Sequence, residues 1–188
     1  MDINDRIAAR VRQIRAERGL SLEALAEGSG VSRSMISLIE RGQSSATAVV
    51  LEKLATSLGV PLASLFDAPA APAVPVSRRK DQVEWRDPAS GYVRRNVSPP
   101  GFPSPMQIVE VAFPAGARVA YETGPRPGAM HQQIWVLQGT LEVTLGEARH
   151  ELGAGDCLAM VVDRPITFRN RTAKPVRYAV VIDHRPHG

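Results

Sequence analysis

The sequence predicts a two-domain protein of the α + β class, with a helical domain followed by an antiparallel β-barrel. Apolar residues recur at helical spacing in residues 1–67 and in alternation in residues 101–188, and these two periods distinguish helices from half-buried strands. Between the two, residues 68–100 begin with a proline-rich stretch and show no helical period. We therefore expect an extended linker there, followed by a basic connecting segment that includes SRRK at 77–80.

The first helix is predicted to run from near the N-terminus to about Gly19. Its apolar residues are Ile3, Ile7, Val11 and Ile14, at intervals of four, four and three. This spacing gives one apolar stripe, and we expect that stripe to cover the next two helices.

Two short helices joined by a tight turn should follow. Ser21 and Ser32 are good N-caps, and Gly-Ser-Gly at 28–30 should end the first of the two, because glycine adopts a left-handed conformation without a Cβ penalty. In the second, Ile36 and Ile39 would face the first helix. The residues left outside are Arg33, Ser34, Ser37, Leu38 and Arg41. Such a polar face suits the major groove of DNA, although an ordinary helical hairpin gives a similar pattern.

A fourth helix is expected with Ser45 as its N-cap and Gly59 as its stop. A closing turn over residues 62–66 would complete the helical domain. The apolar residues expected to line its core are Val49, Val50, Leu54, Ala55 and Leu58.

The segment from Arg10 to Phe66, which contains LSLEALAEGSGVSRSMISLIERGQSSATAVVLEKLATSLGVPLASLF, closely resembles the five-helix DNA-binding domain of the phage-repressor-like, xenobiotic-response-element (XRE) family of transcription regulators. The resemblance implies that Arg15 pairs with Glu40 and holds two helices in register. Ala46 departs from the proline that the family often has there, which removes a little preorganisation.

The residues that we expect at the DNA are Ser21, Ser32, Arg33, Ser34, Ser37, Leu38, Arg41 and Gln43. Base edges would be read by Arg33, Ser34, Ser37 and Leu38, with Leu38 against a thymine methyl group. Phosphates would be contacted by Ser21, Arg41 and Gln43. Residues 1–67 hold eight Lys or Arg and eight Asp or Glu, so this interpretation depends on the motif and not on a strongly basic domain.

The chain has one cysteine, Cys157, in the apolar run DCLAMVV, where packing in a core is the expected role. No apolar stretch approaches the ~18 residues of a membrane span, and the N-terminus MDINDRIAARVRQ is too polar for a signal peptide. A cytoplasmic location without a membrane partner is expected.

Seven short strand-like runs follow residue 100 and are separated by proline or glycine turns: MQIVEVAF, RVAYE, QIWVLQG, LEVTL, DCLAMVV, ITFRN and VRYAVVID. So many short strands are typical of a sandwich or a barrel. PAG at 114–116, VLQGTLEV at 136–143, LGAGD at 152–156 and ITFRN at 166–170 resemble the cupin (jelly-roll) barrel, over residues 101–183.

The cupin family usually binds a metal through two histidines, a glutamate and a third histidine. By resemblance, the glutamate position falls on Gln132, the first two histidines near Arg126 and Gly128, and the third on Ile166. A divalent metal needs several converging carboxylate or imidazole donors, so no metal and no cofactor are expected. His131 lies nearby but alone.

One amide and one guanidinium in an apolar surround suit a small polar or anionic ligand. The expected ligand-binding residues are Arg118, Tyr121, Arg126 and Gln132. Sequence does not decide which of them point inward, and an internal pair between Arg126 and Glu122 in a barrel that binds nothing is the alternative.

Together the two resemblances imply a DNA-binding transcription regulator and not an enzyme. The partners expected are a palindromic double-stranded operator, a small effector sensed without metal, and a second copy of the chain bound through the barrel. One alternative is a cupin-type enzyme with an accessory helical domain, as in the iron-dependent phosphonate epoxidases. Another is a DNA-binding protein whose barrel serves only as a dimerisation scaffold.

Overall fold

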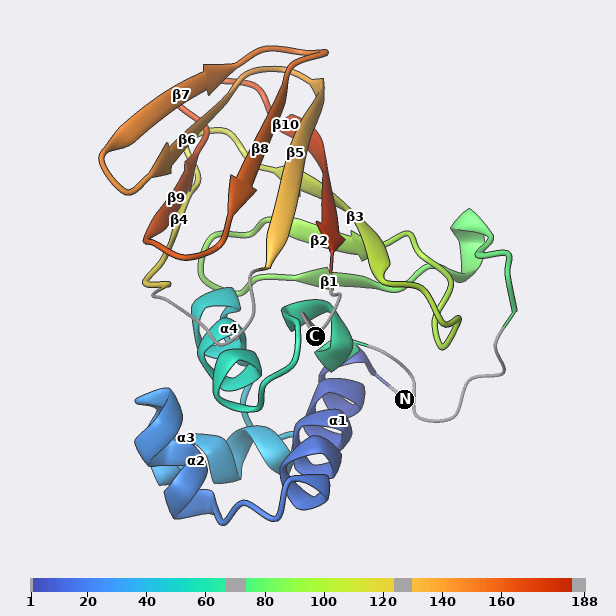
Figure 1. Ribbon diagram of the computed structural model, residues 1–188, viewed down its shortest axis with the longest axis vertical. Helices are drawn as coiled ribbons and strands as arrows, with labels where there is room; N and C mark the ends of the chain where they lie inside the picture. Colours follow the sequence, from blue (N-terminus) through green and yellow to red (C-terminus); the bar gives the residue numbers. More distant parts are fainter. Residues whose placement is uncertain (1, 67–73, 124–129, 184–188) are drawn as a thin grey trace. The chain divides into compact units, whose positions relative to one another are not determined.

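The structure is a computed structural model that describes residues 2–66, 74–123 and 130–183. It contains two compact units: a helical unit within residues 1–77, and a β unit formed by residues 78–98 and 103–188 (Figure 1). Each unit has its own core of buried apolar side chains.

The helical unit consists of α1 (Ile3–Glu17), α2 (Leu22–Ser29), α3 (Arg33–Glu40), α4 (Ala48–Ser57) and the 3₁₀-helix η1 (Leu62–Phe66). The expectation of five helices is therefore corrected, since the described residues form four α-helices. The fifth segment is only five residues long and closes through an i→i+3 bond from Ser64 N to Pro61 O, which is the geometry of a 3₁₀ turn.

Capping residues set the helix starts. Ser21 and Ser32 cap α2 and α3 as predicted, but the cap of α4 is Thr47 and not Ser45, because the Thr47 Oγ1 accepts from Val50 N at 3.3 Å. Gly30, at a φ of 66°, forms the C-cap of α2.

The β unit has two antiparallel sheets. Sheet A has the order β1-β2-β3-β10-β5-β8, and sheet B has the order β4-β9-β6-β7. The strands are β1 (Glu84–Arg86), β2 (Val93–Asn96), β3 (Met106–Phe113), β4 (Arg118–Tyr121), β5 (His131–Gln138), β6 (Leu141–Leu145), β7 (Ala148–Leu152), β8 (Cys157–Val161), β9 (Ile166–Arg169) and β10 (Val176–Asp183).

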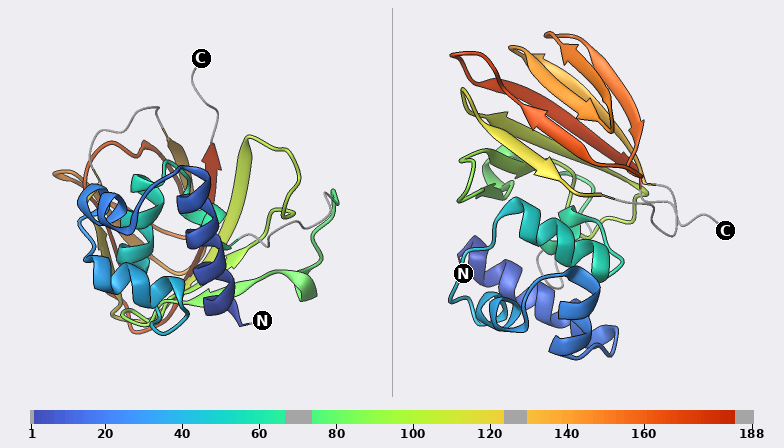
Figure 2. Two further views of the ribbon diagram at one scale, coloured as in Figure 1. Left: turned by 90° about the horizontal axis from the view of Figure 1, so that it is seen from below. Right: turned by 90° about the vertical axis from the view of Figure 1, so that its left-hand side faces the viewer.

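The sheets pack as two layers in a cupin-like fold (Figure 2). The expected closed barrel is corrected, because no pairing in the described residues joins an edge of sheet A to an edge of sheet B.

Two strands lie inside the segment that was expected to be a linker. β1 pairs with β2 through Trp85↔Arg94, and β2 pairs with β3 through Arg94↔Val111. Residues 84–96 therefore extend sheet A.

A chain of aromatic contacts runs through the core between the sheets. Tyr178 stacks on Phe168 with centroids 5.9 Å apart, and Phe113 lies 6.3 Å from Tyr178. Burial raises the pKa of Tyr178 well above the usual tyrosine value, because the charged phenolate would be desolvated. At the end of β9, the buried Asn170 donates to the carbonyls of Pro114 and Lys174, which ties three segments together.

Candidate nucleic-acid interface and ligand site

The turn between α2 and α3 is fixed by short-range hydrogen bonds. Val31 N donates to Ser29 Oγ at 3.2 Å, and Ser32 Oγ accepts from Met35 N at 3.2 Å. Gly30 N donates to Ala26 O at 2.9 Å and closes α2. The two helices are therefore joined at a defined angle, as a helix-turn-helix requires.

The eight residues of α3 divide into a buried side and an outer side. Ile36 and Ile39 are buried, as predicted. The outer side of α3 and the residues after it carry the side chains expected at DNA: Arg33, Ser34, Ser37, Leu38, Arg41 and Gln43. Ser37 and Leu38 are partly buried, and the other four are exposed. The structure thus brings the predicted set onto one face, with Ser21 and Ser32 at the helix starts.

Two of the predicted arginines have partners within the helical unit. Arg33 forms an ion pair with Glu23 of α2, and Arg41 Nε donates to Ser37 O at 3.1 Å. A backbone hydrogen bond lowers the pKa of Glu23, and the Arg33 charge lowers it further. The Glu23–Arg33 pair was not predicted. A carboxylate ten residues before an arginine gives no helical-spacing signal when the two lie on different helices.

The end of α3 is held by Arg15, which donates to both oxygens of the Glu40 carboxylate at 2.7 and 2.8 Å. This bidentate geometry is the strong form of an ion pair, and it raises the pKa of Arg15. The pairing implied by the family resemblance is confirmed. Arg12, which sequence reasoning missed, donates to Glu40 O at 2.8 Å, so two arginines of α1 fix the position of α3.

Gln132 lies on the inner side of sheet A. Along β5 it has the same parity as the buried Ile134 and Val136, whereas the residues of opposite parity, such as Gln133 and Trp135, are exposed. Its cross-strand neighbours are Ile182 and Met160. Its Nε2 lies 3.6 Å from Met130 Sδ, a weak acceptor.

A second amide lies in the same row of sheet A. Gln107 of β3 pairs with Ile182, and its Oε1 is buried without a hydrogen-bond partner in the described part of the chain. Two amides are therefore placed on an otherwise apolar strip of the inner side, separated by one strand. Sequence reasoning missed Gln107. The alternation of MQIVEVAF could have placed it, since it shares the parity of the buried Val109 and Val111.

The other predicted ligand residues are not gathered around Gln132. Tyr121 faces the core, where its ring packs edge-on to Phe168 and its hydroxyl lies 3.3 Å from Tyr92 Oη. Arg118 is exposed and alternates with the buried Val119, so it lies on the outer side of sheet B. Arg126 lies outside the described residues.

No three His, Cys, Asp or Glu side chains converge on a possible metal position in residues 2–66, 74–123 and 130–183. At the position where the cupin pattern has a glutamate the chain has the Gln132 amide, and at the third histidine position it has the buried Ile166. His131 is exposed, on the side of β5 opposite to Gln132. In the same described residues, no helix is both long and apolar enough to span a bilayer.

Comparison with known proteins supports both domains. Residues 11–65 match the HTH_3 helix-turn-helix family model, and residues 110–182 match the Cupin_2 cupin-domain model. Over 178 residues the chain is 25% identical to the HTH-type transcriptional regulator SutR of Escherichia coli K12, covering 95% of this chain and 94% of SutR.

Two solved structures share the fold over nearly the whole chain. An HTH_3 family transcriptional regulator from Vibrio cholerae is 24% identical, with a TM-score of 0.75 and 97% coverage of both chains. The crystal structure of FeII HppE is 15% identical, with a TM-score of 0.50, and covers 96% of this chain and 100% of that chain. At such identities the likeness concerns the fold alone.

The two domain matches agree with the helix-turn-helix geometry of α2 and α3 and with the two-sheet β unit. The chain therefore carries a phage-repressor-like (XRE) helix-turn-helix domain followed by a cupin domain, and over nearly its whole length it is similar to HTH-type transcriptional regulators.

Proposed function

We propose that the protein is a cytoplasmic, homodimeric transcription regulator whose helical unit binds a palindromic operator and whose β unit senses a small polar effector without metal. The DNA-binding part of this proposal is supported chiefly by the exposed polar face of α3, held rigidly by the Arg15–Glu40 pair.

The contacts proposed at the DNA follow from the side chains on that face. Arg33, Ser34, Ser37 and Leu38 are within one helix of two turns, which is the part of a recognition helix that enters the major groove. Arg33 would leave Glu23 to bind a guanine edge. Arg41 and Gln43, beyond the end of α3, would contact phosphates, together with Ser21.

The effector part of the proposal is centred on Gln132. A polar group in an apolar interior is destabilising unless a hydrogen-bond partner satisfies it. The amides of Gln132 and Gln107 lie in one row beside Ile182 and Met160. A small molecule with both donor and acceptor groups would satisfy them. We retain Arg126 and Tyr121 as further candidates, and Arg118 as the least suited of the four.

The first experiment is a binding-site selection with the purified protein, followed by titration of the selected operator in the presence of candidate metabolites. Enrichment of one palindromic sequence is expected. Recovery of random sequences with equal affinity would contradict sequence-specific regulation.

The second experiment tests the sensor. A ligand changes DNA affinity only when it binds the competent and incompetent arrangements differently. The double variant Arg126→Ala, Gln132→Leu should thus lose the effector response and keep operator binding without effector. Glu151→Leu is the control, because Glu151 is an exposed strand residue of β7 in sheet B, away from Gln132. If the double variant responds like the wild type, the β unit is a scaffold and not a sensor.

A further inference from the structure

The outer side of sheet A carries side chains that point away from the core. Along β10 the inward Tyr178, Val180 and Ile182 alternate with Arg177, Ala179, Val181 and Asp183, of which Ala179 is also buried. Strand register extends the outer side across β3, β5 and β8. We call this surface the outer face; its residues are Met106, Ile108, Glu110, His131, Gln133, Trp135, Cys157, Ala159, Val161, Arg177, Ala179, Val181 and Asp183.

The centre of the outer face is apolar. Trp135 is 50% exposed and Ile108 is 41% exposed, and Ala179 and Val181 lie between them in the register. Cys157, expected from sequence to be packed in a core, is instead exposed next to Trp135. Large apolar side chains clustered on a surface commonly mark an interaction site.

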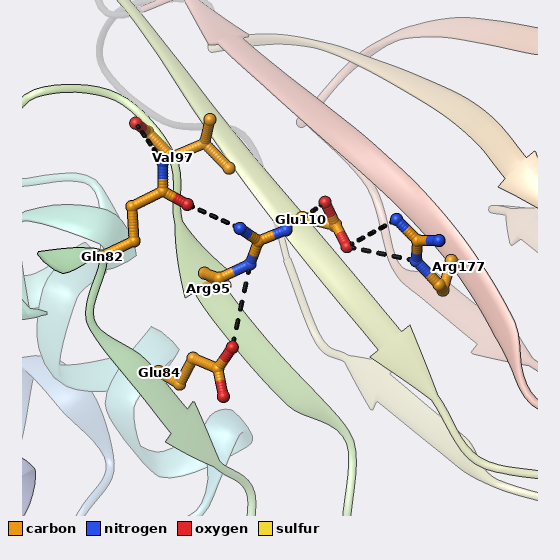
Figure 3. A network of polar contacts seen from close by, with 6 residues as sticks. All are labelled: Gln82, Glu84, Arg95, Val97, Glu110 and Arg177. Carbon is orange, nitrogen blue, oxygen red and sulfur yellow. Dashed lines mark hydrogen bonds and ion pairs between the residues drawn. The ribbon is translucent and has the colours of Figure 1, made fainter. Parts of the chain in front are cut away.

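The two ends of β10 on this face carry opposite charges. At one end Arg177 donates to Glu110 Oε1 at 3.0 Å, and Glu110 also pairs with Arg95, as Figure 3 shows. Arg95 also pairs with Glu84, so this network of two arginines and two glutamates is neutral, and Arg177 is the more exposed of its two arginines. At the other end, Asp183 lies in register with His131 and Met106.

We infer that the outer face packs against the outer face of a second copy, with the two-fold axis lying between the sheets and perpendicular to the strands. A homodimer interface uses the same patch twice, so the patch must complement itself. With this axis the two β10 strands run antiparallel, Arg177 of each copy lies opposite Asp183 of the other, and the apolar centres meet. An axis parallel to the strands would place Arg177 against Arg177. The inference rests on the proposed homodimer and names its interface.

The size of the face is suitable. β3, β10 and β5 have eight residues each and β8 has five, so four strands at ordinary spacing give a surface of at most about 27 by 19 Å. This is a projected area, and side-chain relief adds accessible surface, so the face approaches the ~800 Å² that each partner typically contributes.

The first test is Trp135→Glu, with the oligomeric state measured by sedimentation equilibrium over a range of protein concentrations. Tryptophan at the centre of an interface is a frequent hot spot, so we expect the dimer dissociation constant to rise on the order of 100-fold. Ala148→Glu is the matched control, because it adds the same charge at an exposed strand position of sheet B. The control should remain a dimer.

The second test is charge reversal at the ends of β10. Asp183→Arg alone should weaken the dimer, and adding Arg177→Asp should restore it to near the wild-type dissociation constant. Iodide quenching gives an independent readout, since Trp85 is 3% exposed and Trp135 is the accessible tryptophan. Quenching should fall as the protein concentration rises through the dissociation constant.

These outcomes separate the interface from the proposed function. If Trp135→Glu and Asp183→Arg both stay dimeric, with folding intact by circular dichroism, the outer face is not the interface, even when the operator is bound normally. Iodide quenching that does not change with protein concentration in a dimeric wild type would also rule out the outer face as the interface. It would indicate a dimer formed through another surface. A wild type that dimerises through this face but binds no DNA leaves the inference standing and contradicts the regulator proposal.

Discussion

Arg33 and Arg41 are both exposed near the ends of α3, but their surroundings suggest different roles. Arg33 is held by a side chain, Glu23, whereas Arg41 folds back on the Ser37 carbonyl. Arg33→Ala should lower the affinity for the selected operator by about 1 to 3 kcal/mol and relax specificity at one base pair. Arg41→Ala should weaken binding to all sequences alike and reduce the salt dependence. Anisotropy titrations on operator and scrambled DNA measure both. Equal losses on the two DNAs for Arg33→Ala would refute base reading by this residue.

The pair of Arg15 and Glu40 should behave as a stability element. Both side chains are largely buried, with 18% and 7% exposure, so removing Arg15 leaves a buried carboxylate unpaired. Arg15→Met is expected to lower the stability of the helical unit by about 3 kcal/mol. Both tryptophans belong to the β unit. Unfolding of the helical unit is therefore followed by circular dichroism at a helical wavelength, while tryptophan fluorescence should show an unchanged β unit. A shift in fluorescence and not in dichroism would contradict the assignment.

Residue-scale prediction succeeded where a residue type has one strong local role. Ser21 and Ser32 were predicted as caps and are caps. It failed at Ser45, because Thr47 is an equally suitable cap two residues later and the α4 start is set by the buried Ala48 and Leu51. Cys157 was misjudged because an apolar run does not show which alternate residues face the core. In β8 Met160 is the buried one, and Cys157 has the opposite parity.

At the scale of elements, Asn170 joins the end of β9 to the turns beside it. Its Nδ2 donates to three carbonyls, those of Phe113, Pro114 and Lys174, and its Oδ1 accepts from Thr172. Asn170→Ala leaves these buried groups unsatisfied, so the β unit should lose about 3 kcal/mol of stability. Urea unfolding followed by tryptophan fluorescence measures the loss. Thr172→Ala, on the same turn but exposed, should cost about 1 kcal/mol. Equal effects would mean that the turn and not the buried amide is the anchor.

Glu142 gives sheet B a pH dependence. Arg171 donates to its carboxylate at 2.6 Å and Arg149 lies 2.5 Å from it, and the Arg171 hydrogen bond lowers the pKa of Glu142. A carboxyl group whose pKa is lower in the folded state stabilises the fold at pH values above its unfolded pKa. This contribution is lost as the pH falls through the folded pKa. The melting temperature of Glu142→Gln should thus lie below that of the wild type near neutrality, and the gap should close between about pH 5 and about pH 2. A gap that stays constant across this window would exclude the ion pairs as the cause.

The strands that sequence predicted best are those with the most apolar residues. β3, β6 and β10 lie where the apolar runs predicted them. β1, β2 and β7 were missed because they are short and largely charged, with at most two buried residues each. Their strand conformation depends on pairing with the adjacent strands β2, β3 and β6 and on contacts such as Glu110 with Arg95, which the strand's own residues do not reveal. The barrel was predicted closed because strand number alone does not distinguish a barrel from two open sheets.

At the scale of the whole molecule, the helix-turn-helix and cupin domains were recognisable from local motifs, and the comparisons confirm both. The effector site was not determined by the same reasoning. The glycine pattern indicates which residues stand at the positions of the metal ligands. The direction of a side chain, however, depends on strand parity and on neighbours such as Tyr92, whose hydroxyl lies 3.3 Å from the hydroxyl of Tyr121. The site at Gln132 and the contacts of α3 with DNA therefore stay predictions.

The dimer and the operator should be linked by geometry. A single neutral helical unit makes few phosphate contacts, and specific affinity then depends on two units binding at once. We predict an operator of two half-sites centred about 34 Å apart, or a multiple of this, so that both recognition helices meet the same side of the duplex. Inserting half a helical turn between the half-sites should reduce wild-type affinity at least tenfold, whereas inserting a full turn should reduce it less. Trp135→Glu should bind the paired site only as tightly as an isolated half-site and should be insensitive to both insertions. Footprinting and titration on the three spacings measure this. A wild type that footprints one unpaired half-site with full affinity would show that the chain recognises DNA as a monomer.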